Sequence, residues 1–305
     1  MAKILVTGGL GAVGKPLAVE LKKRGNEVWI ADRVHSAEEN YVRCDVGEFH
    51  QVEELFKRAD FEYVYHLAAE FGRRNGEDFY ENCWKTNAIG TKNILRIQEA
   101  LKFRMIFFSS SEVYGDYRQV MKEDVMDKVP VKQMNDYAMS KWVNEMQILN
   151  SAARFGTEIV RVRLFNTYGP GEYYSEYRSA ICVFIYKALH NLPYTVYTKH
   201  ERTLSYIDDS VRTLANIVKN FKSGEVYNIA GHELHNMKQA SDIILKYLGK
   251  DDSLVEYKDA QPDTTLVKKV DVTKAIRDLQ HKSLVSLEEG IPRTIEWQKE
   301  AYKVG

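Results

Sequence analysis

The chain has few cysteines and no segment long and apolar enough to suggest a membrane span. Of its 305 residues only Cys44, Cys83 and Cys182 are cysteine. Their odd number and wide separation fit neither a disulfide framework nor a zinc site, and we see no other metal-binding pattern. We therefore expect reduced thiols in a cytoplasmic protein. No apolar run approaches the ~20 residues that a membrane-spanning helix needs.

Neither sign of charge is in excess. Lysine and arginine together number 43, as do aspartate and glutamate, so the formal net charge is zero. This balance gives no reason to expect a nucleic acid or an anionic membrane as a partner. Met1 is followed directly by a strand-and-turn pattern, so we expect no signal peptide. The length fits one large domain or two modest ones.

What the chain does have is a glycine-rich turn near its start. An apolar run at 3–7 leads into GGLGAVG at 8–14, a helical stretch at 15–24 and a second strand at 27–31. The order is typical of a dinucleotide-binding unit, in which glycines permit a tight turn and a close approach to pyrophosphate. The N-terminus of the helix then faces the phosphates. We predict that the contacts in this loop are Gly8, Gly11, Ala12, Val13 and Gly14.

Acidic residues at two strand ends bear on the choice of cofactor. Asp32 follows Gly14 by 18 positions, close to the spacing of an acid that binds the adenosine ribose. Because a carboxylate repels a 2′-phosphate, we predict NAD. Arg33 could hold that phosphate, so NADP is not excluded. Asp45, followed by Val46, either reaches the adenine amino group or caps a helix expected at 52–58.

Strands and helices continue to alternate up to residue 165. Such alternation predicts an α/β fold with a doubly wound parallel sheet, a Rossmann fold. After the strand at 63–67, small residues allow a close approach of the backbone to the cofactor, and we include Leu67, Ala68 and Ala69 among its contacts. Beyond Asn166 the pattern is irregular. We predict an NAD-binding domain at 1–165 and a smaller, interleaved substrate lobe at 166–305, part of 206–230 returning to the sheet.

Tyr137 and Lys141 stand four residues apart, ahead of a stretch at 142–153 with helical spacing of apolar residues. Positions i and i+4 of a helix share a face, so both side chains can point into one cleft. A neighbouring ammonium favours phenolate and lowers the pKa of a tyrosine. Tyr137 would then serve as a general acid or base near neutral pH. A solvated surface pair has the same spacing.

Several motifs taken together resemble the extended short-chain dehydrogenase/reductases, and more narrowly their nucleotide-sugar epimerase/dehydratase group. The motifs occur in the family's order and spacing, and the resemblance runs from Lys3 to about Trp297. They are TGGLGAVG at 7–14, HLAA at 66–69, NAIGTKNIL at 87–95, SSSEVYGD at 109–116, YAMSK at 137–141, NTYGPG at 166–171 and RTLSYIDD at 202–209.

The resemblance implies roles for individual residues. Ser110 matches the catalytic serine or threonine, Tyr137 the active-site base and Lys141 the lysine that holds the nicotinamide ribose. Asn87 matches a residue that supports the cofactor site. The implied chemistry is transient oxidation of a nucleotide sugar at C4, giving a 4-keto sugar on which a second group acts.

Two neighbouring residues bear on the reaction of the 4-keto sugar. In similar 4,6-dehydratases the position of Glu112 removes the C5 proton, and the position of Ser111 helps water leave from C6. Similar decarboxylases of nucleotide-linked glucuronic acid show a serine–glutamate pair. Glu112 therefore favours dehydration or decarboxylation over plain C4 epimerisation. Ser111 is a weaker acid than aspartate, which argues against a thymidine-diphosphoglucose type of dehydratase. Glu112 could instead only orient a loop.

The resemblance also implies a substrate and an assembly. Asn166 and Arg202 match positions that contact the diphosphate or sugar of a nucleotide-diphosphate sugar. Arg73 or Arg74 could meet a charged sugar, although a solvated basic turn is the simpler explanation. Family members dimerise through two helices, here 87–100 and 137–153. The second carries an apolar stripe that could equally be core, formed by Met139, Trp142, Val143 and Met146.

Three further functions are compatible with the sequence. One is a simple nucleotide-sugar C4-epimerase, although such enzymes often carry small or neutral residues at the positions of Ser111 and Glu112. An NADPH-dependent keto-sugar reductase is compatible with Arg33. A non-catalytic dinucleotide sensor could share the fold, but such proteins often lack the tyrosine–lysine pair that is present here.

Overall fold

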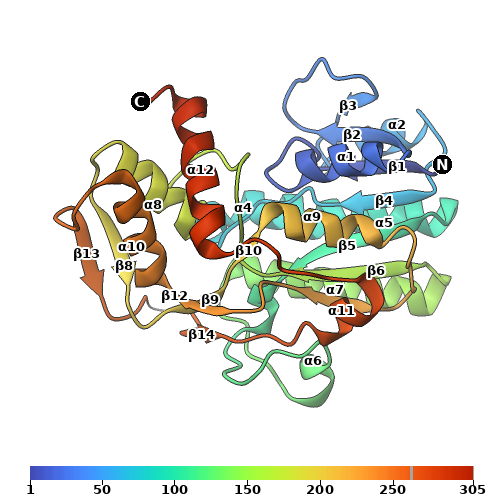
Figure 1. The fold of residues 1–305 in the computed structure, drawn as a ribbon. Helices are drawn as coiled ribbons and strands as arrows, with labels where there is room; N and C mark the ends of the chain where they lie inside the picture. Colours follow the sequence, from blue (N-terminus) through green and yellow to red (C-terminus); the bar gives the residue numbers. More distant parts are fainter. Residues whose placement is uncertain (262–263, 305) are drawn as a thin grey trace.

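A seven-stranded sheet forms the centre of the protein in a computed structural model that describes residues 1–261 and 264–304 (Figure 1). Its order is β11-β6-β5-β4-β1-β2-β3, and every neighbouring pair is parallel. The predicted doubly wound sheet is therefore confirmed. The strands are β1 (Lys3–Thr7), β2 (Glu27–Asp32), β3 (Tyr41–Arg43), β4 (Tyr63–His66), β5 (Arg104–Ser110), β6 (Ile159–Leu164) and β11 (Val226–Ile229).

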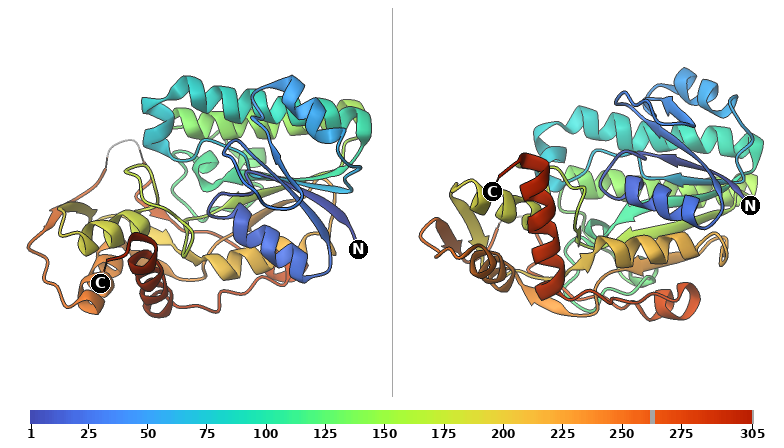
Figure 2. Two further views of the ribbon diagram at one scale, coloured as in Figure 1. Left: turned by 90° about the horizontal axis from the view of Figure 1, so that it is seen from above. Right: turned by 45° about the horizontal axis from the view of Figure 1, so that its top comes forward.

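Helices cover both faces of this sheet, because each crossover between parallel strands returns over one face or the other (Figure 2). One face is covered by α1 (Gly14–Lys23), α9 (Ile207–Asn216) and α11 (Thr273–Leu279). The opposite face is covered by α2 (Phe49–Phe56), α5 (Gly90–Leu101) and α7 (Asp136–Phe155). The apolar faces of these helices and the strands between them form two buried clusters, one on each side of the sheet.

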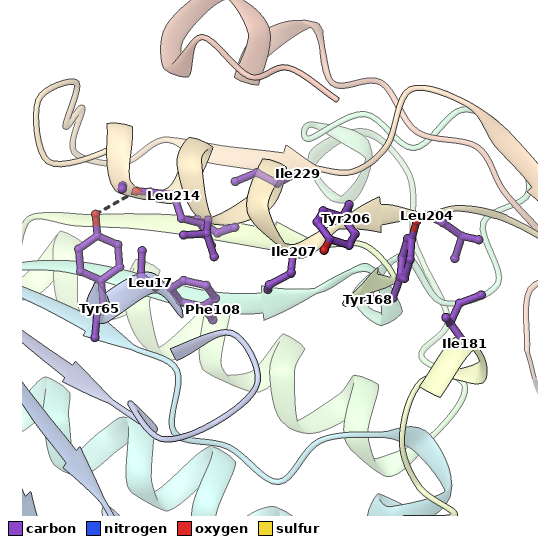
Figure 3. Close-up of a cluster of buried hydrophobic side chains, with 14 of the residues drawn as sticks. Leu17, Tyr65, Phe108, Tyr168, Ile181, Leu204, Tyr206, Ile207, Leu214 and Ile229 are labelled. Carbon is purple, nitrogen blue, oxygen red and sulfur yellow. Dashed lines mark hydrogen bonds between the residues drawn. The ribbon is translucent and has the colours of Figure 1, made fainter. Parts of the chain in front are cut away.

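The larger cluster extends from the sheet into the rest of the molecule (Figure 3). Tyr65 of β4 lies between the sheet and α9, and its hydroxyl donates to the carbonyl of Leu214 at 2.9 Å, which satisfies a buried polar group. Tyr168, Leu204 and Tyr206 continue the same cluster away from the sheet. One core thus joins the sheet to the segments that follow residue 166.

Those later segments form a smaller lobe beside the sheet (Figure 1). Its helices are α8 (Ala180–Leu189), α10 (Met237–Leu248) and α12 (Leu287–Tyr302). A parallel pair joins β8 (Tyr194–Tyr197) to β13 (Val255–Lys258), and β7 (Thr167–Tyr168) pairs with β10 (Ser205–Tyr206). A three-stranded sheet has the order β12 (Leu234–Asn236), β9 (Glu201–Thr203), β14 (Val267–Lys268). Because α9 packs on the main sheet and β11 is one of its strands, the chain passes between the two parts more than once. The domain boundary at residue 165 stays a prediction.

Short elements surround the carboxyl ends of the central strands. They are α3 (Arg73–Asp78), α4 (Tyr80–Cys83), the π-helical segment η1 (Trp84–Ile89), the 3₁₀ turn η2 (Ser111–Tyr114) and α6 (Val125–Lys128). The helix expected at 87–100 is therefore only partly α-helical, since η1 precedes α5. Widened turns of this kind often occur at functional sites.

The structure bears on three expectations from the sequence, and one of them needs correction. The alternative that Asp45 caps the next helix is wrong: α2 begins at Phe49 after Glu48, and Asp45 Oδ1 instead accepts from the amide of Gly47 at 2.8 Å. Within residues 1–261 and 264–304 we find no helix with the length and hydropathy to span a membrane. The three cysteines are buried, unpaired thiols.

Candidate active site

A cavity of about 640 Å³ lies beyond the carboxyl ends of the central strands. Ligands of open α/β sheets bind at this edge, because the loops that follow the strands can diverge there. The loops after β1, β4, β5 and β6 line one side of the cavity, and segments of the smaller lobe line the other. The motifs separated in sequence therefore meet around one space.

The glycine loop forms the end of the cavity nearest α1. A Cβ atom on Gly14 would lie 2.2 Å from the carbonyl oxygen of Gly8. A Cβ atom on Gly8, whose φ is +69°, would lie 2.7 Å from the amide nitrogen of Ala68. The loop is thus folded so tightly against β4 that only glycine fits. Gly11, Ala12 and Val13 line the same wall.

Asp32 and its neighbours form the adjoining wall. Asp32 Oδ2 accepts from the amide of Leu10 at 3.0 Å, which ties the end of β2 to the glycine loop. Arg33 is largely exposed and forms an ion pair with Glu70 at 2.7 Å. Asp45 and Val46 lie on the same side. A close-packed glycine turn beside a carboxylate is the donor and acceptor set that the pyrophosphate and ribose of NAD require, so these residues fit that cofactor.

Asn87 supports this region from behind. It is 1% exposed and lies in η1, outside the residues that line the cavity. Its Oδ1 accepts from the amide of Glu70 at 2.8 Å, and its Nδ2 donates to Ser140 at 3.0 Å. These bonds hold the loop that starts with Leu67, Ala68 and Ala69, which does line the cavity. A direct contact of Asn87 with the cofactor stays a prediction.

Tyr137 and Lys141 both point toward the cavity from the first turns of α7. Asn135 begins this helix, because its Oδ1 accepts from the amide of Ala138 at 2.8 Å. The Tyr137 hydroxyl shares a hydrogen bond with Ser110, at the end of β5. Lys141 Nζ donates to the carbonyl of Phe108 at 2.8 Å. The structure thus brings together the three residues that were predicted to form the catalytic group.

The protonation state of this group differs from our expectation. Burial raises the pKa of Tyr137 well above its usual value, and the hydrogen bond from Ser110 offsets this only in part. The prediction that Lys141 lowers the pKa of Tyr137 is therefore wrong for this structure, where the ammonium is held by Phe108 instead. Burial also lowers the pKa of Lys141 to about 8. Both shifts have the same cause, the loss of water around the charged form of each group.

Glu112 projects from η2 into the next part of the cavity wall. The turn starts where Ser110 Oγ accepts from the Glu112 amide at 3.2 Å, and Ser111 beside it is buried. The Glu112 carboxylate is paired with the ammonium of Lys268. Burial by itself would raise the pKa of Glu112, but Lys268, with more distant arginines, outweighs it and holds that pKa below its usual range. Glu112 is therefore an ionised carboxylate and not a proton donor.

The smaller lobe contributes two polar groups. Asn166 has a φ of +22°, and its buried Nδ2 has no hydrogen-bond partner, so it offers a donor to a ligand acceptor. Arg202 lines the cavity and donates to the carbonyl of Leu266 at 2.6 Å and to His200 Nδ1 at 3.0 Å. Burial lowers the pKa of Arg202 to about 10, so the guanidinium stays charged at neutral pH. Arg73 also lines the cavity.

Sequence reasoning missed Lys268. Its side chain is 2% exposed and it lies outside every motif that we recognised. The segment around it, VKKV, reads as an ordinary charged strand, and nothing in it distinguishes Lys268 from the exposed Lys269. The contact with Glu112 joins residues 156 positions apart, so only the folded chain could show it.

The doubly wound sheet places a glycine loop suited to NAD beside the buried Tyr137–Lys141 pair of α7. This combination defines a dinucleotide-dependent enzyme. Residues 4–230 match the NAD dependent epimerase/dehydratase family. The chain is 31% identical to UDP-glucuronic acid decarboxylase 6 of Arabidopsis thaliana, over 95% of this chain and 87% of that one. It is 29% identical to UDP-N-acetyl-alpha-D-glucosaminuronate decarboxylase of Bacillus cytotoxicus, over 98% of both.

A solved structure gives the same result. UDP-Glucuronic acid 4-epimerase from Bacillus cereus, in complex with UDP-Glucuronic acid and NAD, superposes with a TM-score of 0.88 at 25% identity. The match covers 98% of this chain and all of that one. The chain belongs to the NAD-dependent epimerase/dehydratase family, and the predicted family, enzyme class and use of NAD are confirmed.

Proposed function

We propose that the protein is an NAD-dependent decarboxylase of a uronic acid linked to a nucleoside diphosphate. The observation that carries the proposal is the ionised Glu112 carboxylate, paired with Lys268 in the wall of the cavity next to Ser110 and Tyr137. The relatives named above act, by their names, on UDP-linked uronic acids and support this substrate class.

The chain's own residues would divide the work between proton transfer and cofactor binding. Tyr137, hydrogen-bonded to Ser110, takes the proton of the C4 hydroxyl as the sugar is oxidised. Because burial raises the pKa of its phenol, this transfer requires the phenolate, which the positive charge of a bound nicotinamide would favour. Lys141 holds the nicotinamide ribose with its ammonium. NAD bound in the cavity would supply the acceptor, and later the donor, of the C4 hydride. The glycine loop and Asp32 would hold the cofactor at one end of the cavity.

The chemistry of the oxidised sugar favours loss of carbon dioxide. A uronic acid with a ketone at C4 is a β-keto acid, because its carboxylate is attached to C5. The C5–C6 bond breaks, its electron pair moves toward the C4 carbonyl oxygen, and C5 then takes up a proton. This step needs no base to remove the C5 proton, so an ion-paired Glu112 does not hinder it.

Dehydration, in contrast, does require a base at C5. A base must remove the C5 proton and an acid must assist the departing C6 hydroxyl. Glu112 is a weakened base because Lys268 holds its pKa below the usual range, and Ser111 supplies only a neutral hydroxyl. Of the two reactions that Glu112 suggested from the sequence, decarboxylation is the one that this geometry supports.

Substrate binding is assigned to the smaller lobe. We propose that Arg202 and the unpartnered amide of Asn166 hold the diphosphate or sugar, since both are donors at the cavity wall. In this scheme residues 1–165 chiefly bind NAD and residues 166–305 chiefly bind the nucleotide sugar. The buried thiols suit a reducing compartment such as the cytoplasm.

We also propose a homodimer that forms through α5 and α7. The α7 surface exposes Met139, Met146 and Leu149, with Ile89 exposed next to α5, so apolar side chains gather on two neighbouring helices, as at an interaction site. Trp142 and Val143 are half-buried beside them. Light scattering after size-exclusion chromatography should give twice the monomer mass, and Met146→Glu should give the monomer. A monomeric wild type would contradict the proposal.

The decisive experiment is mass spectrometry of the products from a panel of nucleotide sugars incubated with the enzyme and NAD. Loss of one carbon dioxide from UDP-glucuronic acid or its N-acetylated amino counterpart is the expected result. Loss of water from a neutral hexose would replace the proposal with a dehydratase. An unchanged mass with an altered sugar after hydrolysis would replace it with an epimerase.

A further inference from the structure

Lys268 is a buried lysine whose ammonium meets one carboxylate. It lies in β14, where its Cα pairs with that of Arg202 in β9. The long cationic side chains of Lys268 and Arg202 therefore lie side by side near η2. Of the two, only Arg202 is among the residues that line the cavity. Lys268 is 2% exposed and its ammonium is paired with Glu112, which does line the cavity. Lys268 is thus placed to act on a ligand through Glu112, not by direct contact.

The segment that carries Lys268 is fastened to the chain that carries Glu112. Thr265 Oγ1 donates to the carbonyl of Gly115 at 2.5 Å, one residue beyond η2. The amide of Met121 donates to the carbonyl of Lys269 at 2.8 Å, and the amide of Asp271 donates to the carbonyl of Met121 at 3.0 Å. These bonds flank Lys268 on both sides, so the ion pair has a fixed geometry and is not a chance contact of two flexible side chains.

The charges around the pair explain why both partners stay ionised. A buried ammonium is costly unless a carboxylate compensates it, and burial does lower the pKa of Lys268. The groups that act on Glu112 from the surrounding elements are cations and one phenol, namely Lys268 of β14, Arg202 of β9, Arg73 of α3 and Tyr137 of α7. Burial, together with the same cations, lowers the pKa of His200, between β8 and β9, to about 4, so its imidazole remains neutral.

We propose that Lys268 is a positioning residue: it fixes Glu112 in the cavity wall as a charged hydrogen-bond acceptor for a sugar hydroxyl. This role in turnover rests on the proposed function, whereas the state of the pair itself does not. Without the ammonium, the carboxylate would lose its nearest counter-charge and its fixed orientation. It would then take up a proton at higher pH and present a donor where the substrate needs an acceptor.

The ionisation of Glu112 can be followed without any substrate. In protein labelled with ¹³C at the glutamate carboxyl carbon, the Glu112 signal is assigned by its absence from Glu112→Gln and titrated by NMR. We expect Lys268→Met to raise the titration midpoint of Glu112 by about 1 to 3 pH units, the usual effect of one adjacent opposite charge. Lys268→Arg should restore a low midpoint. Lys269→Met, which removes the exposed neighbouring lysine, is the matched control and should leave it unchanged.

Turnover tests whether Lys268 acts through Glu112. We expect Lys268→Met to lower kcat by roughly 10- to 100-fold, as for a misplaced active-site group, and to shift the acid limb of the pH profile upward. In a double-mutant cycle, Lys268→Met should add little to the loss already caused by Glu112→Gln. Lys268→Gln, which keeps a donor without the charge, replaces the methionine variant if that variant does not fold.

The two proposals fail in different ways. An unchanged Glu112 midpoint in Lys268→Met, or additive losses in the cycle, would overturn the role of Lys268 even in an enzyme that releases carbon dioxide. A wild type that turns over no uronic acid would overturn the proposed function, while a raised midpoint in Lys268→Met would still establish the pair.

Discussion

Arg163 and Glu145 form a two-point ion pair in the interior, where Nε donates to Oε1 at 2.9 Å and Nη2 donates to Oε2 at 2.8 Å. Both side chains are at most 2% exposed. Ser109 Oγ donates to the same Oε1 at 2.6 Å, and Arg163 Nη1 donates to the hydroxyl of Tyr114 at 3.0 Å. Ser109 precedes Ser110 in β5 and Tyr114 is the last residue of η2, so this ion pair anchors both elements next to the catalytic group.

Removing one partner of this pair should destabilise the fold severely. We expect Arg163→Met to cost about 3 kcal/mol of unfolding free energy, because it removes the two-point partner of a buried carboxylate and leaves only Arg161, whose Nη1 lies 3.1 Å from Glu145 Oε2. Urea unfolding monitored by circular dichroism measures the change. Glu289→Gln, which breaks an exposed ion pair with Arg293, is the control and should have little effect. A near-neutral Arg163→Met variant would contradict the role assigned to the pair.

The same pair predicts a pH dependence of stability. Burial alone would raise the pKa of Glu145, but Arg163 outweighs it and holds the pKa below its usual value. A carboxyl with a depressed folded-state pKa contributes stability that is fully present above its unfolded pKa, about 4.3. That contribution should be lost as the pH falls below this value. Glu145→Gln should show a weaker loss of stability over the same acid range than the wild type does.

Tyr137→Phe should abolish turnover while leaving the fold and the cofactor site intact. The phenylalanine ring fills the same space, but no group remains to accept the C4 hydroxyl proton, so we expect kcat to fall by about 10²- to 10⁴-fold. Product formation and NAD binding are measured on the same preparation. Tyr80→Phe, at an exposed tyrosine on α4, should behave as wild type. Full activity of Tyr137→Phe would rule out the proposed proton transfer.

Affinity for NAD should depend on the protonation of Lys141. Burial places the pKa of Lys141 at about 8, so the ammonium is present below that pH and is lost as the pH rises through it. If the ammonium holds the ribose, the dissociation constant measured by calorimetry should increase above pH ~8. Lys141→Met should bind NAD more weakly below that pH, where the wild type carries the ammonium, and should show no inflection. An inflection that persists in Lys141→Met would assign it to another group.

The glycine loop predicts an unequal response to alanine. A Cβ atom on Gly14 would lie 2.2 Å from the carbonyl oxygen of Gly8, whereas one on Gly11 would lie 3.2 Å from that atom. We therefore expect Gly14→Ala to lose NAD binding and to lower the melting temperature. Gly11→Ala should require only a small adjustment of the loop. Thermal shift with and without NAD compares them, and equal effects of the two substitutions would contradict this packing argument.

Much of the site could be predicted because its signals are local. The glycine loop ends at Gly14 and Asp32 follows in the next strand, so spacing alone placed them together. Tyr137 and Lys141 share a helical face because they are four residues apart. The parallel sheet followed from the alternation of strands and helices, since each crossover returns the chain in the same direction.

The tertiary structure decided what depends on residues far apart in the chain and on burial. The sequence determined which residues are present and which face of a helix or end of a strand they occupy. It could not place the ammonium of Lys141 on Phe108, or Lys268 on Glu112, because those contacts arise only when the segments pack together. The same packing removes water, which raises the pKa of Tyr137 and lowers that of Lys141. Residue identity thus set the chemical groups available, and their protonation and pairing came from the fold.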